Sequence, residues 1–111
     1  MLVRTGRFQV LWTDAARRDA EQIVEYVAGD DPKSALNIAE RLQRRCLRLE
    51  RVPARGRVVP ELKAIDVYMY RELIERPWRV VYRFEQNRVY VMAVLDARRN
   101  LVSLLLERLT R

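Results

Sequence analysis

Five arginines in the last third of the chain are the residues whose type and spacing best suggest chemistry. Arg71, Arg79 and Arg83 fall within expected strands, and Arg98 and Arg99 follow the last of them. A guanidinium group stays protonated at working pH and forms a planar fork that pairs with phosphate or carboxylate. These residues therefore predict a site that grips phosphates or an acidic partner.

The hairpin between the last two expected strands decides where two of these arginines point. A two-residue loop ending at Asn87 suits a tight hairpin, because asparagine tolerates the positive φ that such turns demand. This loop places Arg83 opposite Tyr90. The same register places Arg79 opposite Val94. The other face of that strand carries Trp78, Val80, Tyr82 and Phe84.

The preceding hairpin decides the position of Arg71. A turn centred on Arg76 places Arg71 opposite Val81, on the same face as the other strand arginines, whereas a one-residue slip moves it to the opposite face. Arg98 and Arg99 follow the last strand, so we expect four or five guanidinium groups to converge at one end of the sheet. Alternatively, the arginines occupy outward-facing positions and pair with Glu72, Glu75 and Glu85.

Residues that could transfer a proton are scarce. The chain has no histidine and only one cysteine, which removes the Ser-His-Asp, Cys-His and zinc constellations. Glu61, Tyr70 and Glu72 could act as substitutes, but each also suits a strand end or a surface position. If the chain were a ribonuclease, its candidate catalytic set would be Arg71, Arg79, Arg99 and Glu61. We expect neither a metal nor a cofactor.

The composition indicates the class of partner. The formal net charge is +7, and almost all of the positive charge is arginine, since Lys33 and Lys63 are the only lysines. A polyanion or an acidic peptide is the natural partner of such a surface. The alternative is that a GC-rich genome favours arginine codons.

The length and the apolar content predict one globular domain spanning residues 1–111. No apolar run approaches the roughly 20 residues that span a bilayer, and the N-terminus does not resemble a signal peptide, so we expect a cytoplasmic protein. The single cysteine, Cys46, cannot form an internal disulfide and fits the apolar side of a helix.

The first half of the chain predicts a strand and two helices. Residues 7–12 alternate in polarity, and Thr13 or Asp14 then caps a helix that Gly29 ends. Pro32 begins the second helix in the first-turn position. One face of this helix carries Ala35, Ile38, Ala39, Leu42, Cys46 and Leu49. The short connector predicts an antiparallel helical hairpin.

The second half predicts three strands and a helix. The strands cover residues 67–74, 78–85 and 88–95, and the helix covers 101–109. The last strand is apolar on both faces, which is typical of a strand inside a sheet. The order β-α-α-β-β-β(-α) predicts an α+β fold, with a small, mainly antiparallel sheet and a two-helix hairpin on one face.

The segment from Tyr68 to Leu101, YMYRELIERPWRVVYRFEQNRVYVMAVLDARRNL, resembles the C-terminal core of the RelE/ParE family of bacterial toxins. The shared features are a strand with YRE, a strand of the form aromatic-Arg-V-V-Y-R, an apolar strand ending in A-V-L, and R-R before a last helix. The resemblance implies the toxin of a type II toxin–antitoxin system, with a twisted, mainly antiparallel sheet.

The C-terminal run AVLDARRNLVSLLLERLTR is closer to the ParE branch. That resemblance implies a toxin that blocks growth by trapping DNA gyrase on cleaved DNA, without chemistry of its own. The arginines expected to contact the target are Arg71, Arg79, Arg83, Arg98 and Arg99. A ribosome-dependent mRNA endonuclease is the alternative, but Asp96 stands where many such relatives have histidine, and the last helix has no tyrosine or histidine.

The family also implies a cognate antitoxin that wraps an amphipathic, often acidic segment around the toxin. The groove between the helical hairpin and the sheet, and the edge of the sheet, are expected docking surfaces. Further antitoxin-binding candidates are Leu101, Leu104, Leu105 and Leu109, unless they belong to the core. A third hypothesis is an inactive family member that binds only an antitoxin or an operator.

Overall fold

The computed structural model describes residues 7–97 and 101–109, and the side chains of Leu101 and Leu109 lie outside this description. Its elements are β1 (Gln9–Trp12), α1 (Asp14–Ala28), α2 (Pro32–Leu47), η1 (Arg48–Glu50), η2 (Pro53–Arg55), β2 (Arg57–Val58), α3 (Pro60–Lys63), β3 (Arg71–Glu75), β4 (Trp78–Glu85), β5 (Arg88–Asp96) and α4 (Leu101–Leu109). The strands form one sheet in the order β1-β5-β4-β3-β2. Among the strands of the described residues, only β1 and β5 pair in parallel.

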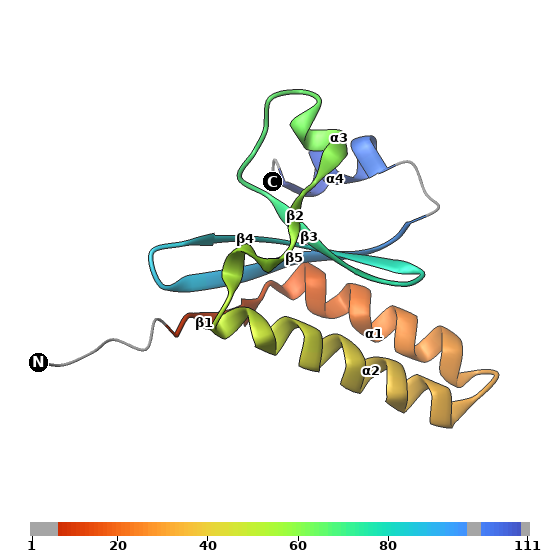
Figure 1. Cartoon of the computed structure of the whole chain (residues 1–111). Coiled ribbons are helices and arrows are strands. Elements are labelled where there is room, and N and C mark those ends of the chain that lie inside the picture. Colours follow the sequence, from red (N-terminus) through yellow and green to blue (C-terminus); the bar gives the residue numbers. More distant parts are fainter. Residues whose placement is uncertain (1–6, 98–100, 110–111) are drawn as a thin grey trace, which may run out of the picture.

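This architecture confirms the α+β prediction. The helical hairpin of α1 and α2 covers one face of the sheet, and α3 and α4 lie on the other (Figure 1). β5 lies between β1 and β4, as its two apolar faces predict. The sequence patterns missed β2 and α3, and β3 begins at Arg71 rather than near residue 67.

Local capping explains where the two long helices begin. The Thr13 hydroxyl accepts a hydrogen bond from the Ala16 amide at 3.1 Å, and this satisfies a free donor of the first turn of α1. Asp31 caps α2 in the same way, and Pro32 occupies the first turn, where its missing N–H costs nothing. Gly29 ends α1, as predicted.

Two apolar clusters pack against opposite faces of the sheet. The helical-hairpin face buries Ala16, Ile38, Leu42, Cys46, Leu49, Leu73, Val80, Tyr82, Val89, Val91 and Val94. The α3/α4 face buries Val59, Leu62, Val81, Ala93, Leu95 and Leu105. Because β4 and β5 contribute to both clusters, these two strands lie at the centre of the fold.

The hairpin between β4 and β5 partly follows the predicted register. Arg83 pairs with Tyr90, as predicted. An irregularity between Val81 and Tyr82 then shifts the register, so Arg79 pairs with Leu95 rather than Val94. A β-bulge of this kind inserts an extra residue into one strand and leaves no trace in an alternating sequence pattern. The positive φ, 53°, falls on Gln86 rather than on Asn87.

The hairpin between β3 and β4 differs by one residue from the prediction. Its loop contains two residues, so Arg71 pairs with Tyr82 instead of Val81. Directly paired residues point to the same face of a sheet. Arg71 therefore lies on the helical-hairpin face, and Glu72 lies with Arg79 on the α3/α4 face. The prediction that Arg71 shares a face with Arg79 and Arg83 is wrong.

Candidate functional site

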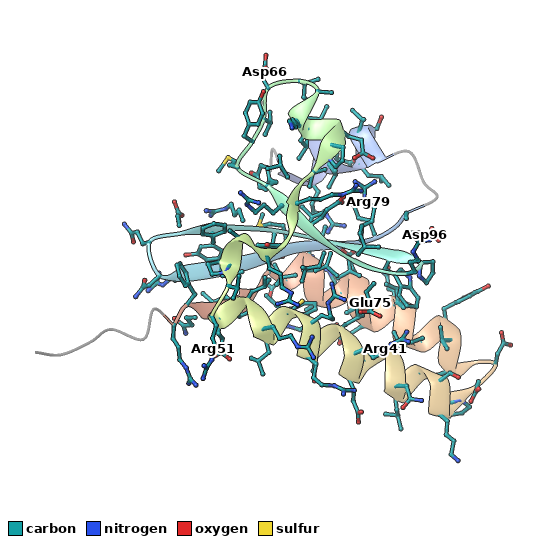
Figure 2. All side chains as sticks on the ribbon, in the orientation of Figure 1. Arg41, Arg51, Asp66, Glu75, Arg79 and Asp96 are labelled. Atoms are coloured by element: carbon teal, nitrogen blue, oxygen red, sulfur yellow. The ribbon has the colours of Figure 1, made fainter. Side chains whose placement is uncertain are left out.

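Arg79 lies in an ion-pair network on the α3/α4 face of the sheet. We name the four residues Arg57, Glu61, Glu72 and Arg79 the arginine–glutamate cluster. Both terminal nitrogens of Arg79 donate to Glu61, each at 2.6 Å, and its Nε donates to Glu72 at 2.5 Å. Figure 2 labels Arg79 between the sheet and the α3 segment. The contacts tie α3 to β3 and β4.

Glu72 is the buried centre of this cluster. Its side chain is shielded from solvent, and its second oxygen accepts a hydrogen bond from Arg57 Nε at 2.7 Å. A carboxylate taken out of water is costly unless it is paired and hydrogen-bonded. Two guanidinium groups meet that requirement here. Arg79 is itself only 7% exposed, so its charge faces inward rather than toward a partner.

The electrostatics of Glu61 make it a weak base. Its hydrogen bonds from Arg79 lower the pKa of the carboxyl group below its usual range, against the opposing effect of partial burial. The same interaction raises the pKa of Arg79. A general base works best with a pKa near the operating pH. A carboxylate with a lowered pKa and both oxygens engaged is therefore poorly suited to activate a hydroxyl group.

Arg71 holds a loop and does not share a face with Arg79. Its Nη1 donates to the Gly56 carbonyl at 2.8 Å and, more weakly, to the Ala54 carbonyl at 3.5 Å. The Gly56 amide donates to the Tyr82 hydroxyl at 2.8 Å, and that hydroxyl donates to the backbone of η2. Arg71 thus anchors the connection between η2 and β2.

Arg83, like Arg71, is partly exposed. Its guanidinium lies over the Tyr90 ring, 4.5 Å from the centroid, and Nη1 donates to Glu85 at 2.7 Å. The cation–π contact orients the partly exposed charge of Arg83. Arg98 and Arg99 lie outside the described residues. Of the arginines expected to converge at one end of the sheet, only Arg79 and Arg83 share a face within the described part of the chain.

Cys46 and Tyr82 also have shifted pKa values, and both residues are buried in the core. Burial raises the pKa of the Cys46 thiol to about 12, so it carries little thiolate at neutral pH. Burial also raises the pKa of Tyr82. In the described ranges no cluster of three His, Cys, Asp or Glu side chains could hold a metal ion. None of the described helices has the length and apolar character needed to cross a membrane.

An ion pair between Asp19 and Arg108 went unnoticed in the sequence. Asp19 accepts hydrogen bonds from both terminal nitrogens of Arg108, at 2.7 and 3.1 Å, and from the Val94 amide at 3.0 Å. These bonds join α1, β5 and α4. One sign of this ion pair was present in the sequence: Asp19 is an acidic residue between Ala16 and Ile23, at the border of the apolar stripe of α1.

The leucines of α4 do not form one exposed face. Leu105 is completely buried in the cluster on the α3/α4 face, so the chain itself covers it. Leu104 lines a cavity of about 450 Å³ between α1 and α4, together with Ile23 and Trp78. The side chains of Leu101 and Leu109 lie outside the described residues. Leu105 therefore belongs to the core of the protein, which was the alternative to antitoxin binding.

A larger groove runs between β1 and the helical hairpin. It has a volume of about 770 Å³. Its lining is mostly apolar, with charged residues of α1 among the apolar ones: Val10, Leu11, Trp12, Arg17, Ala20, Glu21, Val24, Glu25, Ala39, Leu42 and Gln43. We name this the β1 groove. The free edge of β1 borders it, because β1 ends the sheet order and pairs only with β5 among the described strands.

Comparison with known proteins gives one family. Residues 10–101 match the model of the family described as ParE toxin of type II toxin-antitoxin system, parDE. This match covers more than four fifths of the chain, so it includes the helical hairpin, the sheet and the arginine–glutamate cluster. A search of curated proteins found no match.

Two solved structures share the fold. A chain of the chromosomal ParDE TA system from P. aeruginosa matches with a TM-score of 0.69 and 20% identity, covering 82% of this chain and 97% of that one. A chain of the toxin–antitoxin complex RelBE2 from Mycobacterium tuberculosis matches with a TM-score of 0.56 and 19% identity, covering 81% and 91%. At such low identity the likeness concerns the fold alone.

Proposed function

We propose that this chain, which belongs to the ParE toxin family of type II toxin–antitoxin systems, blocks growth by binding DNA gyrase and trapping it on cleaved DNA. The toxin itself catalyses no reaction. The observation that carries this choice over ribonuclease activity is the state of Glu61. Both of its oxygens bind Arg79, and its pKa is lowered, so the expected base of a ribonuclease site is already engaged.

Within this proposal the predicted arginines divide into two roles. Arg83 is partly exposed beside Tyr90, and its side chain holds no other segment of the chain in place, so we assign it, with Arg98 and Arg99, to contact with gyrase or its DNA. Arg71 and Arg79 instead position the loop before β2 and the short helix α3. Loss of activity after Arg79→Ala would consequently reflect a structural change, so this variant is not a clean probe of target contact.

The test is a supercoiling assay with purified gyrase and plasmid DNA. The proposal expects the chain to reduce supercoiling and to leave linear DNA after protease treatment. Arg83→Ala should weaken both effects by about tenfold, the loss expected for about 1.4 kcal/mol of contact energy. Lys33→Ala, at the exposed start of α2, serves as the matched loss of one positive charge and should leave them unchanged.

Unaltered supercoiling at a micromolar excess of toxin would overturn the gyrase proposal. Cleavage of message during cell-free translation would then favour the ribosome-dependent endonuclease. Harmless expression in cells without an antitoxin would instead favour an inactive family member.

We further propose that the β1 groove is the site where the cognate antitoxin neutralises the toxin. Its apolar floor suits the apolar side of an amphipathic segment, and the unpaired edge of β1 offers backbone donors and acceptors. Leu104 remains a second proposed contact, since it lines the smaller cavity. Leu105 is excluded by its burial.

This proposal is tested with the antitoxin encoded beside the toxin. Val24→Lys places a charge in the β1 groove and should weaken antitoxin binding at least about tenfold in calorimetry, because the apolar side of the antitoxin segment must then take an ammonium group out of water. Leu36→Lys is the control, since Leu36 lies on α2 outside the groove and is already 65% exposed. Equal affinities for the two variants would place the antitoxin elsewhere.

A further inference from the structure

The positive charge of the chain is distributed unevenly. Most described arginines in or beside the sheet have a carboxylate partner within 4 Å. These are Arg41, Arg45, Arg57, Arg79, Arg83 and Arg108. These six arginines share five carboxylates, Glu75, Glu72, Glu61, Glu85 and Asp19, so together they leave only one of the seven net positive charges. Most of the excess therefore comes from arginines elsewhere in the chain.

Five arginines gather where α2 ends. A shallow hollow of about 420 Å³ lies where the end of α2, η1, η2 and the start of the described chain meet. Its basic lining residues are Arg7, Arg44, Arg48, Arg51 and Arg55. We name these five the basic end. Arg44 forms a loose exposed pair with Glu40 at 3.8 Å. The other four have no ion pair with any described carboxylate, and Glu50 is the one acidic residue in the lining.

Helix stabilisation accounts for only part of this cluster. A cation near the C-terminus of a helix interacts favourably with the helix dipole, and Arg44 and Arg48 lie there. The effect fades within the last turn. Arg51 and Arg55 lie beyond the end of α2, and Arg7 belongs to another part of the chain. Figure 2 shows Arg51 directed away from the body of the molecule.

We propose that the basic end is a binding surface for the phosphate backbone of duplex DNA. Four guanidinium groups without an ion pair to any described carboxylate, those of Arg7, Arg48, Arg51 and Arg55, line one hollow and suit a repeating array of phosphates. Single-stranded nucleic acid is normally held by stacking on aromatic side chains. The hollow offers none, since its only apolar side chains are Leu47 and Val52. Because the basic end carries positive charge and no aromatic ring, we expect it to bind duplex DNA through the phosphates, without regard to base sequence.

The test measures binding of a fluorescent 20-base-pair duplex of arbitrary sequence by anisotropy over a range of salt concentrations. Each phosphate contact contributes about 0.9 to the slope of log K against log salt. The triple variant Arg48→Gln, Arg51→Gln, Arg55→Gln should therefore lose about 2.7 from the slope and bind at least about tenfold more weakly at low salt. Circular dichroism checks that the variant remains folded.

A matched variant separates a local surface from bulk charge. Arg18→Gln, Arg76→Gln, Arg88→Gln removes the same charge from three exposed positions outside the basic end, and should retain the wild-type slope. Equal losses in the two variants would overturn the proposal. So would an absence of duplex binding, or binding of polyglutamate in place of duplex. The assay contains no gyrase, so its failure and a failure of the gyrase proposal are separate results.

Discussion

Glu72 shows how one buried carboxylate organises its surroundings. It is 1% exposed and lies between guanidinium groups from β2 and β4. If Arg57 or Arg79 is removed, the buried carboxylate of Glu72 keeps only part of its compensating charge. Such a residue lowers stability more than an apolar side chain in the same place would. The arginine–glutamate cluster is therefore primarily a structural device of the α3/α4 face.

We expect Arg79→Met to lower the free energy of unfolding by about 3–5 kcal/mol, the usual cost of breaking a buried ion pair. The measurement is urea denaturation followed by circular dichroism. Arg17→Met breaks an exposed pair with Asp14 and should change stability by less than about 1 kcal/mol. The double variant Arg79→Met, Glu72→Met should be more stable than Arg79→Met alone. A double variant that is no more stable would contradict this account of Glu72.

The lowered pKa of Glu61 predicts a dependence of stability on pH. Glutamate in an unfolded chain titrates near pH 4.3, and the folded value lies below that. Between the two values the unfolded state binds a proton that the folded state does not, so acid favours unfolding. The stabilisation is present above about pH 4.3 and is lost as the pH falls through the folded pKa. In Glu61→Gln the urea midpoint of unfolding should depend less on pH over this window. An unchanged pH dependence would exclude a contribution of Glu61.

At the scale of elements, the connection from η2 to β2 depends on a close approach of backbone to sheet. A Cβ atom at Gly56 would lie 2.4 Å from the Glu72 carbonyl oxygen and 2.8 Å from the Tyr82 hydroxyl. Real atoms do not approach so closely, and the Gly56 backbone has an ordinary φ of −76°. Glycine is needed here for space rather than for conformation.

Two glycine substitutions distinguish these causes. Gly56→Ala should destabilise the fold by about 1–3 kcal/mol, since the loop or β3 must shift. Gly29→Ala should stabilise it by about 0.4–1 kcal/mol, because Gly29 has right-handed helical angles and its added Cβ meets nothing closer than 3.4 Å. Thermal and urea unfolding would measure both variants. A neutral Gly56→Ala would show that the loop yields easily.

On the scale of the whole molecule, one sheet separates two apolar clusters. Val80 and Tyr82 of β4 face the helical hairpin, whereas Val81 faces α3 and α4. Loosening either layer exposes side chains of the same central strands. The two layers should therefore unfold together rather than one after the other.

A pair of truncations tests this coupling. Leu42→Ala on the helical-hairpin face and Leu105→Ala on the α3/α4 face should each cost about 2–5 kcal/mol. Both should preserve a single transition, with coincident tryptophan fluorescence and circular dichroism. Leu36→Ala, at an exposed position, should change stability by about 0.5 kcal/mol or less. Separate transitions in the Leu105→Ala variant would mean that α4 and its layer unfold independently.

Local features were predictable from the sequence because each depends on neighbours in the chain. The Thr13 and Pro32 helix starts, the stop at Gly29, and the apolar faces of α2 and β5 all follow from spacing and from single-residue preferences. The same patterns are sufficient for the α+β fold and, with the motif around the last strands, for the toxin family.

The pairing of distant residues could not be predicted from the residue patterns and follows from how the strands pack against one another. A loop one residue shorter than expected placed Arg71 on the face opposite Arg79 and Arg83, and it brought Glu72 onto the same face as Arg79. Side chains alternate with a period of two, so a one-residue shift exchanges the faces of an entire strand, while the composition stays the same. Residue patterns along the chain were enough to predict an arginine-rich protein with the α+β fold of the toxin family. Three-dimensional packing decided which arginines hold the protein together and which remain available at its surface.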